Sequence, residues 1–299
     1  MKRDARKPVL PEHKLLRVLQ GATLSELPWL VHGFSVRPGG MSTCYEGRSV
    51  NLGFTKEDSR GNVEENRKRF LCSLGAETRG DPWPLIVNRQ VHSDMIHIVH
   101  ARSPEPLAGD GLITNAPGVV IAVLTADCLP VLLADPKNRV AGAFHAGWRG
   151  TVQRIVEKGV GVMRRQFGSR PEDIHAAIGP GIQKCCYAVG DDLKTTFGSQ
   201  FAYAADLFHE VQSSDKLREK YPLLFLNARA PGHGDPGIQS YLDLTEANRR
   251  QLVDSGVPKK QISISGECTS CDTGKFFSHR ADHGRTGRMM AAIGIKLDG

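Results

Sequence analysis

The chain has 299 residues, of which 40% are hydrophobic and 24% are charged, a balance typical of ordinary soluble globular proteins and not of disordered chains. Its 39 Lys and Arg residues exceed its 32 Asp and Glu residues, which gives a formal charge of +7. The basic residues are scattered, however, and aromatic residues make up only 6%, so few rings are present on which bases could stack. We therefore expect no nucleic acid partner, whereas anionic small molecules fit the charge well.

The termini and the cysteines indicate the cellular compartment. The N-terminus is basic but lacks the apolar segment of a secretory signal, and no apolar run is long enough to span a bilayer. We expect a cytoplasmic protein with no membrane partner. Seven cysteines, an odd number, favour reduced thiols over a disulfide framework. We interpret the C-x-x-C motif of Cys268 and Cys271 as a partly buried structural pair. Cys185-Cys186 is too tight to hold one metal ion comfortably through both thiols, so we expect at least one of the two in the core.

The first third of the chain contains a glycine turn and a short polar motif. Residues 1–21 are charged and contain prolines, so we expect a loosely ordered N-terminal arm before a single domain over residues 22–299. After a strand predicted over residues 29–36, Arg37 precedes Gly39 and Gly40. These glycines let backbone amides approach a ligand, and the guanidinium suits a carboxylate or phosphate, although a plain turn is the alternative.

Two polar positions follow, each with a structural alternative. Asn51 could bind the polar edge of a ligand, or it could form an Asx turn. A helix is predicted over residues 63–74, and a strand over residues 85–91 ends at His92. His97 and His100 alternate with Ile and Val, which is typical of the outer face of a strand, so we do not expect them to be ligands.

In the central stretch of the chain, polar and potentially reactive residues follow two apolar strands. The strand predicted over residues 119–124 leads to Asp127 and Cys128, and the strand over residues 140–144 ends at His145. Residues 110–114 form another predicted turn and strand. A helix is expected over residues 151–167 with Thr151 as its N-cap. Because its N-terminus follows Arg149, this region suits an anion.

The rest of the chain alternates further strands and helices. Strands are predicted over residues 174–178, 261–265 and 289–295, and helices over residues 191–197 and 242–252, the last capped by Asp243 or Thr245. No internal repeat is visible. The mixture favours an α/β (α+β) fold, a layered single domain with mixed β-sheets flanked by helices.

His92, Cys128 and His145 are the candidate metal ligands. Two imidazoles and a thiolate suit Zn²⁺, and three protein ligands leave a fourth tetrahedral position for water or substrate. A Cys128 nucleophile activated by His145 is one alternative, and a buried cysteine beside two hydrogen-bonded histidines is another. The residues alone leave these three options open. Asp127 is the nearest carboxylate for proton transfer, unless it only orients a ligand histidine.

Six motifs occur in the order that is typical of one protein family. They are QVHS, DGLIT, TADCLPVLLAD, HAGWRG, IGPGIQKCCYAVG and FFSHRADHGRTGR. Over residues 30–295 the chain resembles the YfiH-like family, also called the laccase-domain or polyphenol-oxidase family. The resemblance implies a YfiH-like fold and one zinc ion per chain, held by His92, Cys128 and His145.

The resemblance also implies an activity and a set of binding residues. Family members are described as purine nucleoside phosphorylases acting on adenosine, inosine and methylthioadenosine, with adenosine deaminase activity, and bacterial relatives are linked to peptidoglycan editing. Family motifs fall on the predicted substrate- or phosphate-binding residues Arg37, Gly39, Gly40, Asn51 and Arg280, and on the predicted catalytic residues Asp127 and Arg149. His279 stands where the family often has tyrosine, and Ser93 where glycine is common.

We therefore expect a zinc-dependent purine nucleoside phosphorylase with adenosine deaminase and methylthioadenosine phosphorylase activity. Its partners would be a purine nucleoside and inorganic phosphate, and it would be a monomer or a homodimer. One alternative is a copper-dependent polyphenol oxidase (laccase), although the chain lacks the clustered His-x-His pairs expected of multicopper sites. The other is a cysteine hydrolase or peptidoglycan editing factor that uses Cys128.

Overall fold

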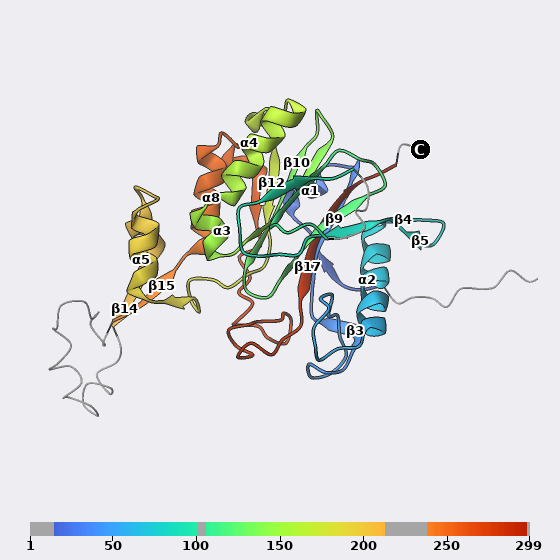
Figure 1. Cartoon of the computed structure of the whole chain (residues 1–299), viewed down its shortest axis with the longest axis horizontal. Coiled ribbons are helices and arrows are strands. Elements are labelled where there is room, and N and C mark those ends of the chain that lie inside the picture. Colours follow the sequence, from blue (N-terminus) through green and yellow to red (C-terminus); the bar gives the residue numbers. More distant parts are fainter. Residues whose placement is uncertain (1–14, 101–105, 213–237, 298–299) are drawn as a thin grey trace, which may run out of the picture.

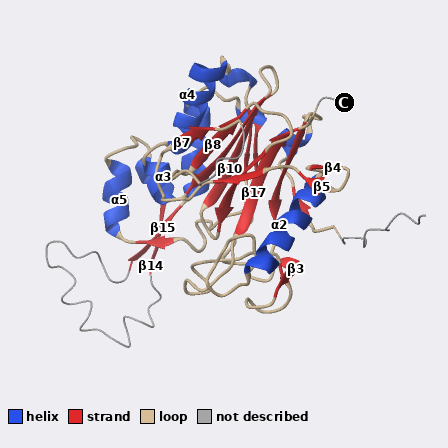
Figure 2. Ribbon diagram, turned by 45° about the vertical axis from the view of Figure 1, so that its right-hand side comes forward, coloured by secondary structure: helices blue, strands red, loops and turns tan. Residues whose placement is uncertain are grey.

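Two β-sheets stacked face to face, with helices on both outer faces, form the body of the protein (Figures 1 and 2). This computed structural model describes residues 15–100, 106–212 and 238–297. The predicted fold class, a layered α/β (α+β) arrangement of mixed sheets and helices, is confirmed.

The first sheet has five strands in the order β1-β2-β17-β9-β6. Its strands are β1 (Val18–Leu19), β2 (Leu30–Ser35), β17 (Met289–Ile295), β9 (Val120–Thr125) and β6 (Leu85–Val87). The bounds of β17 match the prediction. Val18–Leu19, which the sequence assigned to a loose arm over residues 1–21, instead pair with β2 at the edge of this sheet. Residues 1–14 of that arm lie outside the described residues.

The second sheet has six strands in the order β16-β12-β10-β11-β8-β7. Its strands are β16 (Ile262–Ile264), β12 (His175–Ile178), β10 (Leu129–Asp135), β11 (Val140–Ala146), β8 (Gly111–Thr114) and β7 (Ile96–Ile98). Smaller strands outside the two stacked sheets are β3 (Pro38–Ser42), the β4 (Glu77–Thr78) and β5 (Asp81–Pro82) pair, and the three-stranded sheet β13 (Ala188–Val189), β15 (Ile238–Leu242) and β14 (Phe208–Gln212).

Helices pack around the two large sheets, and Leu24 of the first helix lies in the layer between them. They are α1 (Ala22–Ser25), α2 (Arg60–Leu74), α3 (Trp148–Val152), α4 (Ile155–Phe167), α5 (Asp191–Gly198) and α8 (Leu244–Asp254), with 3-10 turns at Pro171–Asp173, Ala204–Leu207 and Lys259–Gln261. α2 packs on the five-stranded sheet through Phe70 and Leu71. α4 and α8 pack on the six-stranded sheet, as Figure 1 shows. Among the described residues, no helix is both long enough and apolar enough to cross a membrane.

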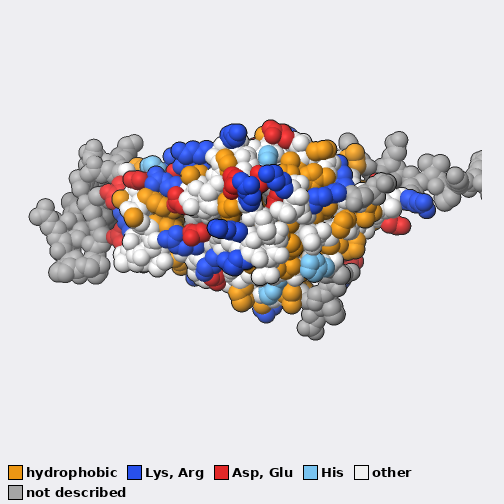
Figure 3. Space-filling model, turned by 90° about the horizontal axis from the view of Figure 1, so that it is seen from above, with side chains coloured by type: hydrophobic (Ala, Val, Ile, Leu, Met, Phe, Trp, Pro, Cys, Tyr) orange, Lys and Arg blue, Asp and Glu red, His pale blue; other side chains and the backbone are white. Residues whose placement is uncertain are grey.

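Both faces of the central strands are buried, which explains their continuous apolar sequence. In β10, Val131 and Leu133 point to the helix layer, whereas Leu132 and Ala134 point into the layer between the two sheets. This alternation follows the two-residue period of a strand. By contrast, acidic and basic side chains are interspersed on the outer face shown in Figure 3, in agreement with the scattered charge in the sequence.

The predicted helix over residues 151–167 is two helices, and its predicted cap is wrong. The chain turns between α3 and α4 at Arg154, which has a left-handed backbone with φ of 63°. This turn lets α4 lie along the sheet, where Gly159 packs tightly against the ring of Phe144. Thr151 is buried inside α3 and accepts a hydrogen bond from Asn248 Nδ2. Asp243 does cap α8, because its carboxylate accepts from the Glu246 N–H.

Candidate metal centre

Three residues that are far apart in the sequence meet at one end of the stacked sheets. His92 lies in the loop after β6, His145 is near the end of β11, and Cys128 lies in the short crossover from β9 in one sheet to β10 in the other. Their ligand atoms all lie within 4.8 Å of one another. The two imidazole rings are 4.9 Å apart and nearly perpendicular. The structure thus brings together the three residues that the sequence selected as metal ligands.

The backbone at this site adopts conformations that most residues avoid. His92 has a φ of 58° and Asp127 a φ of 84°, both in the left-handed region that is uncommon for residues other than glycine. Gly147 comes so close to the site that a Cβ atom on it would lie 2.9 Å from Cys128 Sγ and 3.4 Å from His92 Cδ2. Glycine at position 147 is therefore required for the Cys128 thiol and the His92 imidazole to approach each other.

The buried carboxylate of Asp110 holds the segments that carry His92 and His145 in place through hydrogen bonds. Its Oδ1 accepts a hydrogen bond from His145 Nδ1 at 2.8 Å and from the His92 N–H at 3.1 Å. Its Oδ2 accepts from the backbone N–H and the hydroxyl of Ser93, at 2.7 and 2.8 Å, and from the Val91 N–H at 3.2 Å. These bonds hold the pKa of the Asp110 carboxyl well below its ordinary value despite its burial. Because Nδ1 of His145 is engaged, Nε2 is the nitrogen that faces the thiol.

The thiol and the imidazole stabilise each other as an ion pair. Burial by itself would raise the pKa of Cys128, but the positive charge and hydrogen bond of His145, aided by His92, lower it to about 6. Burial by itself would lower the pKa of His145, but the Cys128 thiolate and Asp110 together raise it to about 9. A thiolate at neutral pH is the form that binds a metal ion, and it is also the form that acts as a nucleophile.

A cavity of about 390 Å³ opens beside the three residues, a size typical of small-molecule sites. It is lined by Asn88, Gln90, His92, Leu124, Ala126, Cys128, His145, His279 and Arg288. These lining residues include amides, imidazoles and one guanidinium, but no carboxylate. The wall of the cavity therefore favours a neutral or anionic ligand.

The carboxylate of Asp127 is hydrogen-bonded to groups other than the ligand histidines. Its Oδ1 accepts from Thr269 Oγ1 at 2.7 Å, and its Oδ2 accepts from the Arg280 N–H at 2.6 Å. Among the described residues, the carboxylate that contacts a ligand histidine is that of Asp110. The alternative in which Asp127 orients a ligand histidine is therefore wrong, whereas its role in proton transfer stays a prediction.

Arg37, Gly39 and Gly40 are not among the residues that line the cavity. The Arg37 guanidinium is buried and donates to the backbone oxygens of Thr273, at 2.8 Å, and Tyr45. A Cβ on Gly40 would collide with the backbone of residue 49, so this glycine permits close packing of two chain segments. These contacts serve the fold, and phosphate binding by the three residues stays a prediction.

Asn51 is hydrogen-bonded to the segment that carries Arg288. It is fully buried, and its Oδ1 accepts from the N–H groups of Gly53 and Arg288, which includes the Asx turn named as an alternative. A Cβ on Gly53 would lie 2.6 Å from Arg288 Cγ. The Asn-Leu-Gly motif thus makes room for Arg288 and fixes its backbone at the cavity.

Arg149 and Arg280 lie near the site on the side of Tyr187. Arg149 is stacked on the ring of Trp148, and the Arg280 guanidinium lies over the ring of Tyr187 and donates to the Ala188 oxygen. Burial and the negative charges of Cys128 and Asp127 raise the pKa of Tyr187 to about 12, although the two arginines act against this shift. Arg149 and Arg280 are both exposed, so their guanidinium groups are accessible to an anion.

His97 has a structural contact, as its alternation with apolar residues suggested. Its Nε2 lies 2.7 Å from the Ala108 oxygen. A Cβ on Gly109 would lie 2.9 Å from the same ring. His97 therefore anchors the loop before β8.

The sequence interpretation missed several residues of the site. Asp110 was assigned only to a turn, and Asn88, Gln90, His279 and Arg288 were not selected. A polar signal was present for two of them, since Asn88 and Gln90 lie four and two residues before His92. Asp110 and Arg288 reach the site through contacts between distant segments, so their local sequence gave no indication.

A second group of possible metal ligands contradicts our interpretation of the other cysteines. The sulfur atoms of Cys185, Cys186, Cys268 and Cys271 lie within 4.8 Å of one another. Cys185 is exposed and Cys186 half-buried, so neither belongs to the core. The Cys268 and Cys271 motif is therefore not an isolated pair.

Comparisons with known proteins place the chain in a family. The model of a family described as multi-copper polyphenol oxidoreductase laccase matches residues 31–296. The purine nucleoside phosphorylase of Deinococcus radiodurans is 39% identical over 269 residues, which cover 88% of each chain. Adenosine deaminase RL5, from an unidentified prokaryote, is 31% identical over 88% of this chain and 93% of its own.

Solved structures agree with this placement. The crystal structure of Bacillus licheniformis hypothetical protein YfiH matches with a TM-score of 0.74 and 34% sequence identity, over 89% of this chain and 93% of that one. From the site motifs, the family model and the shared fold, we conclude that the chain belongs to the laccase-like, YfiH family that its sequence motifs predicted.

Proposed function

We propose that this protein is a zinc-dependent purine nucleoside phosphorylase with adenosine deaminase and methylthioadenosine phosphorylase activity. The observation that carries the proposal is the convergence of His92, Cys128 and His145 on the wall of a cavity whose lining residues include no carboxylate. The names of the relatives, purine nucleoside phosphorylase and adenosine deaminase, support it.

The ligand set fits a zinc ion. Two imidazole nitrogens and one thiolate are donors that zinc prefers, and three protein ligands are typical of catalytic zinc sites. The hydrogen bond from His145 to Asp110 is the kind of contact that fixes the tautomer of a zinc-bound histidine. When bound, zinc supplies an activated water or polarises a group of the substrate.

Phosphorolysis requires a cationic surface for inorganic phosphate. Arg288 is the guanidinium on the cavity wall, and Arg280 and Arg149 lie at the Tyr187 side of the site. A guanidinium binds phosphate oxygens through charge-assisted hydrogen bonds. We assign the phosphate contact to Arg288, with Arg280 and Arg149 raising the local positive potential.

Deamination requires a group that moves a proton near the ligand residues. Asp127 directly precedes Cys128, and its hydrogen bond to the Arg280 N–H ties it to the loop that carries His279. We assign proton transfer to Asp127 and contact with the substrate to His279, which lines the cavity.

The experiment is a product analysis with and without phosphate. Purified protein of measured zinc content is incubated with adenosine, inosine or methylthioadenosine, and the products are separated by chromatography. We expect free base and ribose 1-phosphate, or its methylthio analogue, only when phosphate is present, and inosine from adenosine without phosphate. Cys128→Ala should abolish all of these products, and Cys72→Ala, which changes a cysteine in α2, should not. The proposal fails if zinc-loaded protein converts none of the three nucleosides.

A copper-dependent polyphenol oxidase is the second candidate. The family description favours it, and two imidazoles with one thiolate also occur in mononuclear copper sites. Elemental analysis distinguishes the two, because copper with a blue absorption band and oxidation of phenols would replace zinc and nucleoside turnover.

A cysteine hydrolase or peptidoglycan editing factor is the third candidate. The lowered pKa of Cys128 beside His145 supports it, because a thiolate is an effective nucleophile. Protein isolated without metal at this site, but inactivated by alkylation of Cys128, would favour this candidate over the other two.

A further inference from the structure

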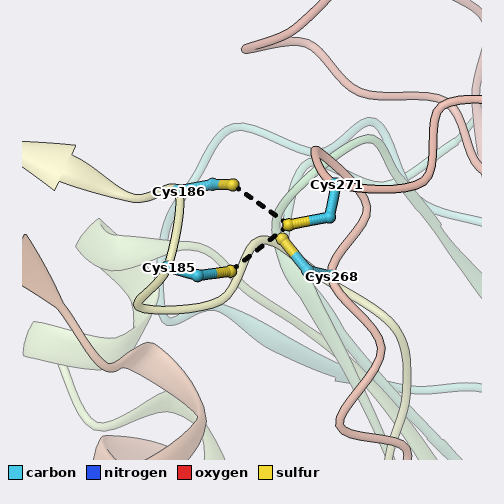
Figure 4. A group of neighbouring side chains, drawn as sticks. All are labelled: Cys185, Cys186, Cys268 and Cys271. Atoms are coloured by element: carbon cyan, nitrogen blue, oxygen red, sulfur yellow. Dashed lines mark hydrogen bonds between the residues drawn. The ribbon is translucent and has the colours of Figure 1, made fainter.

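Four thiols on two distant segments point toward one another (Figure 4), and two of them, Cys185 and Cys271, are exposed. Cys185 and Cys186 lie in the turn before β13, and Cys268 and Cys271 lie in the loop after β16. Cys271 Sγ is 3.5 Å from Cys185 Sγ and 3.3 Å from Cys186 Sγ. All four sulfur atoms lie within 4.8 Å of one another.

This spacing fits a central ion better than it fits disulfide bonds. A tetrahedral zinc ion with zinc–sulfur bonds of about 2.3 Å separates its sulfur ligands by about 3.8 Å. A disulfide requires a separation of about 2.05 Å. Cys271 lies at nearly equal distance from both members of the adjacent pair, whereas a disulfide would join it to only one of them. An ion at the centre engages all four sulfurs at once.

The backbone around the thiols provides donors of the kind that support metal thiolates. The Gln183 N–H donates to Cys268 Sγ at 3.4 Å, and the backbone amides of Ser270 and Cys271 also interact with this sulfur. Outer hydrogen bonds of this type orient the ligands of a metal and stabilise their negative charge. The two-residue spacing between Cys268 and Cys271 is that of structural zinc sites.

The two segments are already joined by backbone contacts. Residue Gly181 forms a bridge with Cys268, and the Thr269 N–H donates to the Gly181 oxygen at 3.2 Å. The parallel pairing of β12 with β16 sends the segments that follow both strands to the same edge of the sheet. The fold therefore preorganises the four thiols.

We propose that Cys185, Cys186, Cys268 and Cys271 form a second metal site, which binds one zinc ion through four thiolates. With all four ligands supplied by the protein, the site is structural in character. It joins the turn before β13 to the loop after β16.

This site adjoins the candidate metal centre. Thr269, between the two cysteines of the loop, donates to Asp127 at 2.7 Å, and Tyr187 directly follows Cys186. A metal that fixes both segments thus also fixes Asp127 and the Tyr187 ring. The inference concerns these four thiols only and does not depend on the proposed phosphorylase activity.

Metal stoichiometry and sulfur coordination test the proposal. Full-length protein is purified under reducing conditions with zinc supplied, and bound zinc is measured after gel filtration. We expect two zinc ions per chain in the wild type and one in the Cys268→Ser, Cys271→Ser double variant. His92→Ala should also retain one, and X-ray absorption of that variant should show zinc with four sulfur neighbours at about 2.3 Å. Cys72→Ser, a matched control in α2, should retain two.

A measurement on the wild type covers the case in which the double variant does not fold. Zinc in the wild type should show on average two and a half sulfur neighbours, because one site supplies four and the other one. One zinc per chain with a single sulfur neighbour would overturn the proposal. The intact mass of protein kept under reducing conditions provides a second check. A mass lowered by the hydrogens that thiols lose on forming disulfides would show that the four cysteines are disulfide-bonded, and this result would also overturn the proposal.

Discussion

Replacing Asp110 by asparagine tests whether a buried carboxylate controls the candidate metal centre. The change keeps the shape of the side chain but turns one acceptor oxygen into an NH₂ donor. If the NH₂ group faces His145, the imidazole must accept at Nδ1 and carry its hydrogen on Nε2, the nitrogen that should bind metal. If it faces Ser93 instead, the two backbone N–H groups and the hydroxyl that donate to Oδ2 lose their acceptor.

Both orientations are costly, and their magnitudes follow from the contacts. Loss of an outer carboxylate partner lowers metal affinity by about 10- to 100-fold, or about 1.4 to 2.7 kcal/mol. A buried donor left without an acceptor costs about 1 to 3 kcal/mol of unfolding free energy. The folded-state pKa of Asp110 is lowered, so its contribution is complete above the unfolded pKa of about 3.9 and is lost only as the pH falls further. At pH 7 the full effect of Asp110→Asn is present.

Chelator competition gives the metal affinity, and urea denaturation of the metal-free protein gives its stability. The matched control is Asp135→Asn. Asp135 is equally buried and accepts hydrogen bonds from the N–H groups of Lys137 and Asn138 and from the Asn138 side chain. It lies at the end of β10 that is remote from Cys128. This control variant should lower the stability without changing the metal affinity. If Asp110→Asn binds metal as the wild type does, or if both variants weaken binding equally, the role of Asp110 is refuted.

Three further predictions concern the same centre. Gly147→Ala places a Cβ 2.9 Å from the Cys128 sulfur. It should lower turnover by about 100-fold, which is the loss expected when a catalytic group is displaced by about 1 Å. The control Gly61→Ala, in α2 with open space around it, should leave turnover unchanged. In metal-free protein the rate of Cys128 alkylation by iodoacetamide should rise with pH, with a midpoint at a pH of about 6, because the thiolate forms there. His145→Ala should move this midpoint to higher pH. An unchanged midpoint in the variant would contradict the ion pair. His97→Ala should retain both metal and activity, which Cys128→Ala loses, and equal losses would show that the histidines are misassigned.

Local sequence patterns predicted the strands of the core well, because their burial leaves a clear signature. Residues 289–295 form a continuous apolar run and are buried throughout β17. Residues 140–144 were likewise predicted, and β11 extends only two residues further. Thr151 misled us because its residue type suits a helix cap, whereas the chain instead begins α3 at Trp148 and turns again at Arg154.

Contacts between distant segments account for what the sequence did not reveal. Asp110 reaches His145 because β8 pairs with β11, with Gly111 opposite Phe144. Likewise the four thiols meet because β12 pairs with β16, with Ile178 opposite Ile264. Periodicity predicts that a strand exists but not which strand it pairs with, so neither Asp110 nor the cysteine group could be placed from the residues alone.

The register of β10 against β11 decides whether the candidate centre exists. Leu129 lies opposite Ala146 and Pro130 opposite His145, which brings Cys128 close to Gly147. A shift by one residue would turn every side chain of a strand to its other face. In β10 such a shift would move Val131 and Leu133 from the helix layer into the layer between the sheets, and would move Leu132 and Ala134 out to the helix layer, so that neither layer keeps the side-chain volumes that now fill it. Packing of the core therefore selects the register, and the register in turn places the thiol of Cys128 next to the imidazole of His145.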